Sequence, residues 1–557
     1  MIDDLSFLAQ SPFNLDLEGI DWVRKTAARL PLDEQIAQLF NIGVRGPTQG
    51  WADEIRRLKP GGVTRLFREG GDAELEMLDR MRAEADVPLL VSADLEGSRM
   101  SFKFGTTFPS PLAVAAVDDL SVSRKVAVAM AIEAAAIGIN WSFTPVLDIN
   151  AAWRSAIVAT RSYGTDPDRV LDNALVQMNA FQQAGIAACL KHWPGEGYDD
   201  RDQHTVTTVN PLSMEDWEAS FGRMYRAAIE AGALSIMSAH IALPAFVRSI
   251  DPGARVEAYR PASASLLLNE ELLRKRLGFN GLIVSDASEM AGLTSFVELI
   301  EAKVELLRNG CDMVLFTRDL PRDISNVRAA LECGYLPRER FAMALARVLG
   351  MKAALKLHQT REFGPRQERL KAINIRGQKE VAAQATLLAP TLVKDVQKLF
   401  PISPKTHRRI YFAGMDVVHP IDGTFPLALP QLLRDRGFEV TEHVVGETIA
   451  CEGHDLVLFA FADETLLCRN RIWLDWTGLT GHFSNSMKRP WFDIPTAMLS
   501  FGFPYYLYDA PRMPAYVNAY NSTEEMQRAV VACITGEAPF AGRDPVDSFC
   551  GLEDARY

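Results

Sequence analysis

Hydrophobic positions in the first two-thirds of the chain form short continuous apolar runs, separated by longer segments with a helical period. This alternation is typical of βα units, in which helices cover a parallel sheet. Helical patterns fall at 123–138, 168–185 and 214–232. The runs number eight, which predicts a closed (β/α)8 TIM-like barrel. They occupy residues 39–44, 61–67, 88–94, 140–148, 186–192, 234–240, 281–286 and 312–316.

A second domain is expected after the barrel. Residues 357–385 are polar and basic with no clear apolar period, so we predict a linker that follows a barrel domain of residues 1–356. Beyond it come strand-like runs and an amphipathic helix, which predict a smaller α/β sandwich domain over residues 386–557. These elements are expected at 408–414, 455–461, 495–502 and 523–537.

Polar residues end several of the predicted strands. One such residue alone would be read as a simple strand end. Five of them, on five different strands, predict a shared cleft, because active sites of such barrels lie at the carboxyl ends of the strands. They are Asp94, Asp148, His192, His240 and Asp286.

The segment KHWPGEGYDDRDQHT (191–205) follows the fifth strand and is too polar for a core. It is open to three interpretations: a solvated loop, a metal site or a mobile catalytic loop. Pro194, Gly195 and Gly197 indicate a loop that bends or moves, whereas a metal site needs rigidly held ligands. Retaining glycosidases need a carboxylate nucleophile and a second group that acts as acid and then base. Asp286 and this loop are candidates for the two roles.

Composition narrows the possible partners. The formal charge is −12, which argues against nucleic acid, and no stretch approaches the roughly 20 apolar residues of a membrane span. The seven cysteines are scattered without metal-ligand spacing, which argues against a disulfide framework and for a reducing compartment. Acidic residues stand near the amino terminus, where a secretory signal needs basic ones. We therefore expect a soluble cytoplasmic protein.

The chain resembles the bacterial retaining β-N-acetylglucosaminidases of glycoside hydrolase family 3. The likeness covers most of the chain, including FGFPYYLYDAPRMPAYVNAY (501–520) in the second domain. In the barrel it is carried by VPLLVSADLEGSRM (87–100), RSYGTDPDRV (161–170), KHWPGEGYDDRDQH (191–204) and LGFNGLIVSDASEMAGL (277–293).

The resemblance implies that Asp286 is the nucleophile and that Asp202 and His204 form an acid/base dyad on a flexible loop. An ordinary imidazole titrates at about 6.5, so it can donate and accept a proton near neutral pH. Asp202 would orient the ring. A neutral imidazole also repels an anion less than a carboxylate does, which leaves phosphorolysis as a variant outcome.

Further residues match family positions that bind the terminal sugar, and charged groups suit hydroxyl recognition. They are Asp94, Arg161, Lys191 and His192.

Three positions depart from the family pattern. Glu196 stands where the family usually has His, Phe102 where it carries a second sugar-binding Arg, and Ser98 replaces a customary Gly. We expect Glu196 and Phe102 to contact the substrate and alter specificity. For Glu196 two alternatives stay open: it would alter the docking of its loop, or act on His204 through its charge. We expect Glu464, in the second domain, to be a solvated loop acid.

The leading prediction is a retaining exo-β-glycosidase, a β-N-acetylhexosaminidase that removes terminal β-linked N-acetylglucosamine. The resemblance implies a small carbohydrate as the partner and neither metal nor organic cofactor. The second domain would serve packing or a homodimer. The alternatives are a family 3 glycosidase or phosphorylase with another sugar specificity, and a non-hydrolytic sugar-binding protein.

Overall fold

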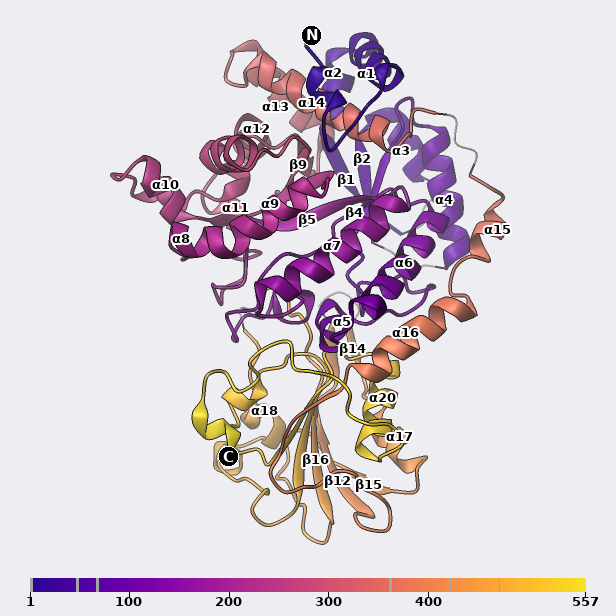
Figure 1. Cartoon of the computed structure of the whole chain (residues 1–557), viewed down its shortest axis with the longest axis vertical. Helices are drawn as coiled ribbons and strands as arrows, with labels where there is room; N and C mark the ends of the chain where they lie inside the picture. The colour runs from indigo at the N-terminus through magenta and orange to yellow at the C-terminus, as the bar shows by residue number, and fades with distance from the viewer. Residues whose placement is uncertain (1–3, 47–49, 67–69, 360–362, 420–422, 470) are drawn as a thin grey trace.

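The computed structural model describes residues 4–46, 50–66, 70–359, 363–419, 423–469 and 471–557. Phe67, at the end of the second predicted strand, and residues 360–362 of the predicted linker lie outside the described residues. The chain forms a barrel followed by a second layered domain (Figure 1).

Eight parallel strands close into a barrel, which confirms the predicted fold class. Each strand falls in one of the eight apolar runs. The last strand pairs with the first, so all eight carboxyl ends meet at one rim. The strands are β1 (Phe40–Arg45), β2 (Gly62–Leu66), β3 (Leu90–Ala93), β4 (Trp141–Ser142), β5 (Ala187–Trp193), β7 (Ser235–Ser238), β9 (Leu282–Ala287) and β10 (Met313–Leu315).

Helices cover the outside of the barrel where the helical period predicts them. Helix α6 (Leu120–Ile137) ends at Gly138, which adopts a left-handed conformation, and α7 (Pro167–Gln183) begins after an Asp166 cap. The pattern at 214–232 is divided into α8 (Met214–Trp217), a π-helical turn and α9 (Arg223–Glu230).

Four helices lie together at the end of the molecule away from the second domain (Figure 1): α1 (Leu17–Arg29), α2 (Leu32–Ala37), α13 (Leu320–Glu332) and α14 (Arg338–Ala354). These helices contain a fully buried lysine, Lys352 of α14. Its Nζ donates to Gln38 Oε1 at 2.6 Å. Because Gln38 precedes the amino end of β1, this amine lies at the amino end of that strand and not at the carboxyl rim.

The segment between the two domains contains two helices, α15 (Arg366–Leu370) and α16 (Arg376–Leu388). Helix α16 packs against α6 of the barrel and α20 (Glu524–Ile534) of the second domain. It continues past residue 385, where we proposed that the linker ends.

The second domain is built on a six-stranded sheet with the order β11-β18-β17-β16-β12-β15. Helices α17 (Leu429–Arg434) and α20 lie on one side and α18 (Trp476–Thr480) on the other (Figure 1). Three of its strands and α20 fall in the predicted runs. The strands are β11 (Thr391–Asp395), β12 (Arg409–Gly414), β15 (Glu439–Glu442), β16 (Leu456–Phe461), β17 (Thr496–Ser500) and β18 (Ala515–Asn518).

The two domains share a core. Leu112, Ala113 and Ala116 of α5 (Pro111–Ala116), although part of the barrel domain, pack into the hydrophobic cluster of the second domain. Hydrogen bonds add to this contact: Ser110 Oγ donates to the Tyr520 carbonyl at 2.8 Å, and the Tyr505 hydroxyl to the Asn150 carbonyl at 3.1 Å.

Within the described ranges, no helix combines the length and apolar character needed to cross a bilayer. All seven cysteines are free thiols.

Candidate active site

A cavity of about 420 Å³ lies at the carboxyl rim of the barrel, where the second domain meets it. Strand-end residues form its floor, and the segment around Glu464 forms part of its wall. Six of the residues expected in the site line it: Asp94, Arg161, Lys191, His192, His204 and Asp286.

A buried network of charges occupies one side of the cavity. Glu96 accepts two hydrogen bonds from Arg161, at 2.8 and 2.9 Å, and lies 2.7 Å from Lys191 Nζ. Lys191 also donates to Asp94 at 2.7 Å. Burial opposes the charge on Glu96, but Arg161 and Lys191 outweigh it and hold its pKa well below the usual value. The four charges balance, which presents fixed donors and acceptors to a hydroxylated ligand.

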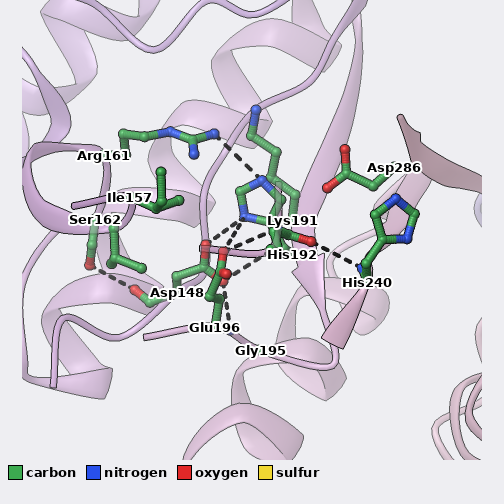
Figure 2. Close-up of polar contacts among 12 residues, drawn as sticks. Asp148, Ile157, Arg161, Ser162, Lys191, His192, Gly195, Glu196, His240 and Asp286 are labelled. Atoms are coloured by element: carbon green, nitrogen blue, oxygen red, sulfur yellow. Dashed lines mark hydrogen bonds and ion pairs between the residues drawn. The ribbon is translucent and has the colours of Figure 1, made fainter. Parts of the chain in front are cut away.

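His192 lies between Arg161 and Asp148 (Figure 2). Its Nδ1 is 2.6 Å from Asp148 Oδ2, and its Nε2 is 3.5 Å from Arg161 Nη2. Asp148 Oδ1 accepts the main-chain N–H groups of His192 and Glu196. Burial opposes ionisation of Asp148, but His192 and these N–H groups lower its pKa. Asp148 therefore fixes the orientation of the His192 ring.

Asp286 reaches the cavity from the end of β9 and is held by the Ala287 N–H at 2.7 Å. Burial would raise its pKa, but the imidazoles of His240, His192 and His204 outweigh burial, so the pKa lies below the usual value. Asp286 is thus a carboxylate at neutral pH, as a nucleophile must be.

His240, one of the five residues predicted at the shared cleft, is hydrogen-bonded within the barrel wall and does not line the cavity. Its Nδ1 lies 2.8 Å from Ser263 Oγ and its Nε2 3.0 Å from the Ala287 carbonyl.

His204 faces the same cavity from the loop after β5. Its Nδ1 and its main-chain N–H both lie within 2.8 Å of Asp202 Oδ1. The second oxygen of Asp202 accepts the main-chain N–H of Cys468, from the second domain, at 2.7 Å. Burial alone would raise the pKa of Asp202. The His204 contacts and the Cys468 N–H outweigh burial and lower the pKa below its usual value, so Asp202 stays ionised. The dyad geometry leaves His204 Nε2 free of Asp202.

Phe102 and Glu196, which we expected to contact the substrate, lie behind the cavity wall. Phe102 belongs to the barrel core and stacks on Phe104 at 5.9 Å between ring centroids. Glu196 is buried beside Asp148 (Figure 2). Phe102 follows β3 and Glu196 follows β5, and spacing in the sequence could not show that each side chain turns into the protein.

Asp148, His192 and Glu196 form a group whose potential ligand atoms lie within 4.8 Å of one another. Metal binding would need free lone pairs on Asp148, but one oxygen accepts two N–H groups and the other lies at hydrogen-bond distance from His192. The donor set therefore fits a hydrogen-bonded network better than a metal ion.

Three further residues line the cavity or organise its charges and were not predicted as site residues. Arg45 follows the first apolar run directly, so the strand-end argument could have found it. Glu96 stands in the DLEG segment, two residues after Asp94. Glu464, expected as a solvated acid, has a side chain only 11% exposed at the domain contact and accepts from Ser98 and Ser522. No local signal distinguishes it.

A TIM-type barrel with a carboxylate, a carboxylate-oriented imidazole and buried charged groups around one pocket defines a carbohydrate-active enzyme. A protein-family model, described as glycosyl hydrolase family 3 N terminal domain, matches residues 31–351 of the chain. The chain belongs to this family and is a glycoside hydrolase.

Relatives match far beyond the barrel. A β-N-acetylglucosaminidase/β-glucosidase of Cellulomonas fimi is 36% identical over 563 residues, 98% of this chain and 99% of that protein. The solved structure of a β-glucoside phosphorylase, BglX bound to 2FGlc, superposes with a TM-score of 0.91 at 34% identity, covering 98% of this chain and 100% of that one. A β-hexosaminidase of Nitrosomonas eutropha is 30% identical over 290 residues, half of this chain and 80% of that protein.

Proposed function

We propose that the protein is a retaining exo-β-glycosidase in which Asp286 is the nucleophile and His204 the acid/base. The observation that carries this proposal is that both side chains line one pocket while Asp202 holds the His204 ring at 2.7 Å.

The reaction follows in two steps. The Asp286 carboxylate attacks the anomeric carbon while imidazolium His204 donates its proton to the departing oxygen, which gives a glycosyl ester and a neutral imidazole. His204 then takes a proton from water as the water oxygen attacks the anomeric carbon and releases Asp286. Asp202 stabilises the imidazolium in the first state and sets the ring orientation in both.

The substrate proposed is a terminal β-linked N-acetylglucosamine, which would be oriented by Asp94, Arg161, Lys191 and His192. The names of the Cellulomonas fimi and Nitrosomonas eutropha proteins support this choice. The pocket has a floor of strand ends, which suits removal of a single terminal residue.

A second candidate is phosphorolysis of a β-glycoside, in which phosphate replaces water in the second step. The 34% identical β-glucoside phosphorylase supports it, as does the use of an imidazole where a carboxylate would repel the anion. Rates and products with nitrophenyl β-glucoside and β-N-acetylglucosaminide, each with and without inorganic phosphate, separate the two. A glycosyl phosphate product would establish phosphorolysis, and free sugar alone would establish hydrolysis.

The acid/base role is tested with His204→Ala. It should slow aryl glycosides with poor leaving groups by about 100-fold or more, and activated dinitrophenyl glycosides much less, because only the former need the proton. Asp286→Ala should abolish turnover of both kinds while the melting temperature stays near that of the wild type. Equal slowing of both substrate classes by His204→Ala would contradict the assignment.

A cytoplasmic location and a homodimer remain predictions, which cell fractionation and analytical ultracentrifugation would check.

A further inference from the structure

Glu196 makes a specific contact with the acid/base loop. Its side chain is 2% exposed, and its Oε2 accepts a hydrogen bond from Gln203 Nε2 at 3.1 Å. Its Oε1 finds no hydrogen-bond partner among the described residues. Buried polar groups normally have hydrogen-bond partners. The bond to Gln203 is the one side-chain hydrogen bond of Glu196 among the described residues, which indicates a role for that contact.

Gln203 is the residue between Asp202 and His204 in the chain. Its Oε1 accepts the main-chain N–H of His240 at 3.0 Å, and its side chain is buried. Since only Oε1 can accept that N–H, the amide nitrogen must face Glu196. Gln203 therefore ties the dyad to two points of the barrel, the end of β7 and Glu196.

The main chain of Glu196 is anchored on the barrel. Its N–H donates to Asp148 Oδ1 at 3.0 Å, and its carbonyl accepts from Ile149 at 3.2 Å. Gly195 and Gly197 beside it have φ of 118° and 113°, and a Cβ at Gly197 would lie 1.8 Å from the Ile149 carbonyl oxygen. This close packing gives Glu196 a fixed position from which to hold Gln203.

We propose that Glu196 and Gln203 form a latch that holds Asp202 and His204 over the cavity, so that Glu196 is a positioning residue for the acid/base step. The kinetic consequence rests on the proposed function, in which His204 transfers the proton. The latch itself is a statement about where the loop lies and can be tested without substrate.

The charges around Glu196 favour its uncharged form. Burial is the main cause that raises its pKa well above the usual value, and the carboxylates of Asp148, Asp202 and Asp286 add to it. Arg161 opposes the shift, and His192 Nδ1 lies 3.9 Å away. As a neutral carboxylic acid, Glu196 accepts the hydrogen bond from the Gln203 amide without adding another negative charge beside these carboxylates. Glutamine should therefore replace Glu196 well, and alanine should not.

Loop position is measured by amide hydrogen exchange over residues 198–206 in the substrate-free full chain. We expect exchange there to be at least about ten-fold faster in Glu196→Ala and Gln203→Ala, because loss of the latch lets the loop open. Glu196→Gln should stay near the wild type. Asp200→Ala is the matched control, since it removes an exposed carboxylate from the same loop. If Glu196→Ala folds and its loop exchange is unchanged, the latch is overturned. If Glu196→Ala does not fold, unchanged loop exchange in Gln203→Ala overturns the latch instead.

Kinetics test the consequence for proton transfer. In Glu196→Ala, kcat should fall about ten-fold or more for glycosides with poor leaving groups, change little for activated ones, and recover in Glu196→Gln. The double variant Glu196→Ala/Gln203→Ala should be no slower than the worse single variant, because both remove one device. Additive losses, or equal slowing of both substrate classes, would overturn the positioning role. If the wild type cleaves no glycoside, the proposed function fails while the exchange result still decides the latch.

Discussion

Charged side chains on one side of the cavity stabilise one another in a chain of short contacts. Glu96 is the centre of this chain, because it contacts both Arg161 and Lys191, and Lys191 in turn contacts Asp94. The side chains of Glu96 and Lys191 are each 2% exposed, so water cannot replace a lost partner. The pKa of Lys191 is raised because these carboxylates outweigh its burial, and Lys191 remains a cation in the folded protein.

Replacing Glu96 by alanine should lower the free energy of unfolding by about 3–5 kcal/mol, since it removes the carboxylate that pairs with both Arg161 and Lys191 and leaves Asp94 as their remaining partner. Denaturant unfolding of Glu96→Ala and of the wild type measures the difference. Asp200→Ala is the control at an exposed position and should change the free energy of unfolding by less than about 0.5 kcal/mol. A loss below about 1 kcal/mol for Glu96→Ala would show that the network reorganises around the gap.

At this scale the sequence predicted the residue types of the site well, because a polar residue at the end of an apolar strand must lie at the barrel rim. It failed where the side-chain direction depends on packing. Phe102 and Glu196 point into the protein. Gly195 and Gly197, which predict a loop that bends or moves, adopt positive φ, and Gly197 packs closely against Ile149. Positive φ and a close main-chain neighbour are invisible without the fold.

Among the elements, α14 carries Lys352, whose amine is buried beside Gln38. Burial alone lowers the pKa of Lys352 to about 7, and its Nζ contacts Gln38 Oε1, a neutral acceptor. An unfolded lysine titrates at about 10.4. Between these two values the unfolded chain binds more protons than the folded one, so the free energy of unfolding rises with pH. The cost of burying the amine is fully present below pH 7 and disappears as the pH approaches 10.

The variant Lys352→Met should lack this dependence. The stability of the wild type relative to Lys352→Met should therefore increase by about 2 kcal/mol between pH 7 and pH 9. Urea unfolding of both proteins at the two pH values measures it, and the change with pH is independent of the hydrogen bond that the variant loses. A difference that stays constant with pH would mean that Lys352 is charged in the folded protein.

The elements themselves were the most predictable part of the fold. All eight barrel strands fall in the expected apolar runs because buried parallel strands need continuous apolar sequence. Strands β11, β15 and β18 of the six-stranded sheet were not predicted. Strand β15 shows the reason: it lies at the edge of the sheet and most of its residues are exposed, so its sequence has little hydrophobic pattern.

For the molecule as a whole, the second domain contributes to the cavity wall. Glu464 Oε1 accepts from Ser98 Oγ in the barrel at 2.9 Å and from the main chain and hydroxyl of Ser522 at 2.6 and 2.5 Å. Ser98 has φ of 49°, which is uncommon outside glycine, and its hydroxyl makes this contact between domains. A few residues further on, the Cys468 N–H holds Asp202. The geometry of the cavity therefore depends on both domains.

Glu464→Ala should lower the free energy of unfolding by about 1–3 kcal/mol, because it leaves the Ser98 and Ser522 donors unsatisfied at a buried contact. It should also raise KM, because the segment that it anchors lines the cavity. Denaturant unfolding and steady-state kinetics on one substrate measure the two effects. Glu537→Ala removes an exposed ion pair with Arg436 in the same domain and should have little effect on either. An unchanged KM with lost stability would limit Glu464 to a structural role.

The sequence by itself determined the barrel, the second α/β domain and the rim on which most of the charged residues of the site stand. Hydrophobic periodicity is local, and parallel strands bring their carboxyl ends together whatever the details of packing. Only the tertiary structure decided that Glu196 faces Gln203, that Glu464 lines the cavity and Cys468 holds Asp202 from the other domain, and that Phe102 lies in the core. Those contacts join residues far apart in the chain or depend on which way a packed side chain turns, and no local pattern encodes either.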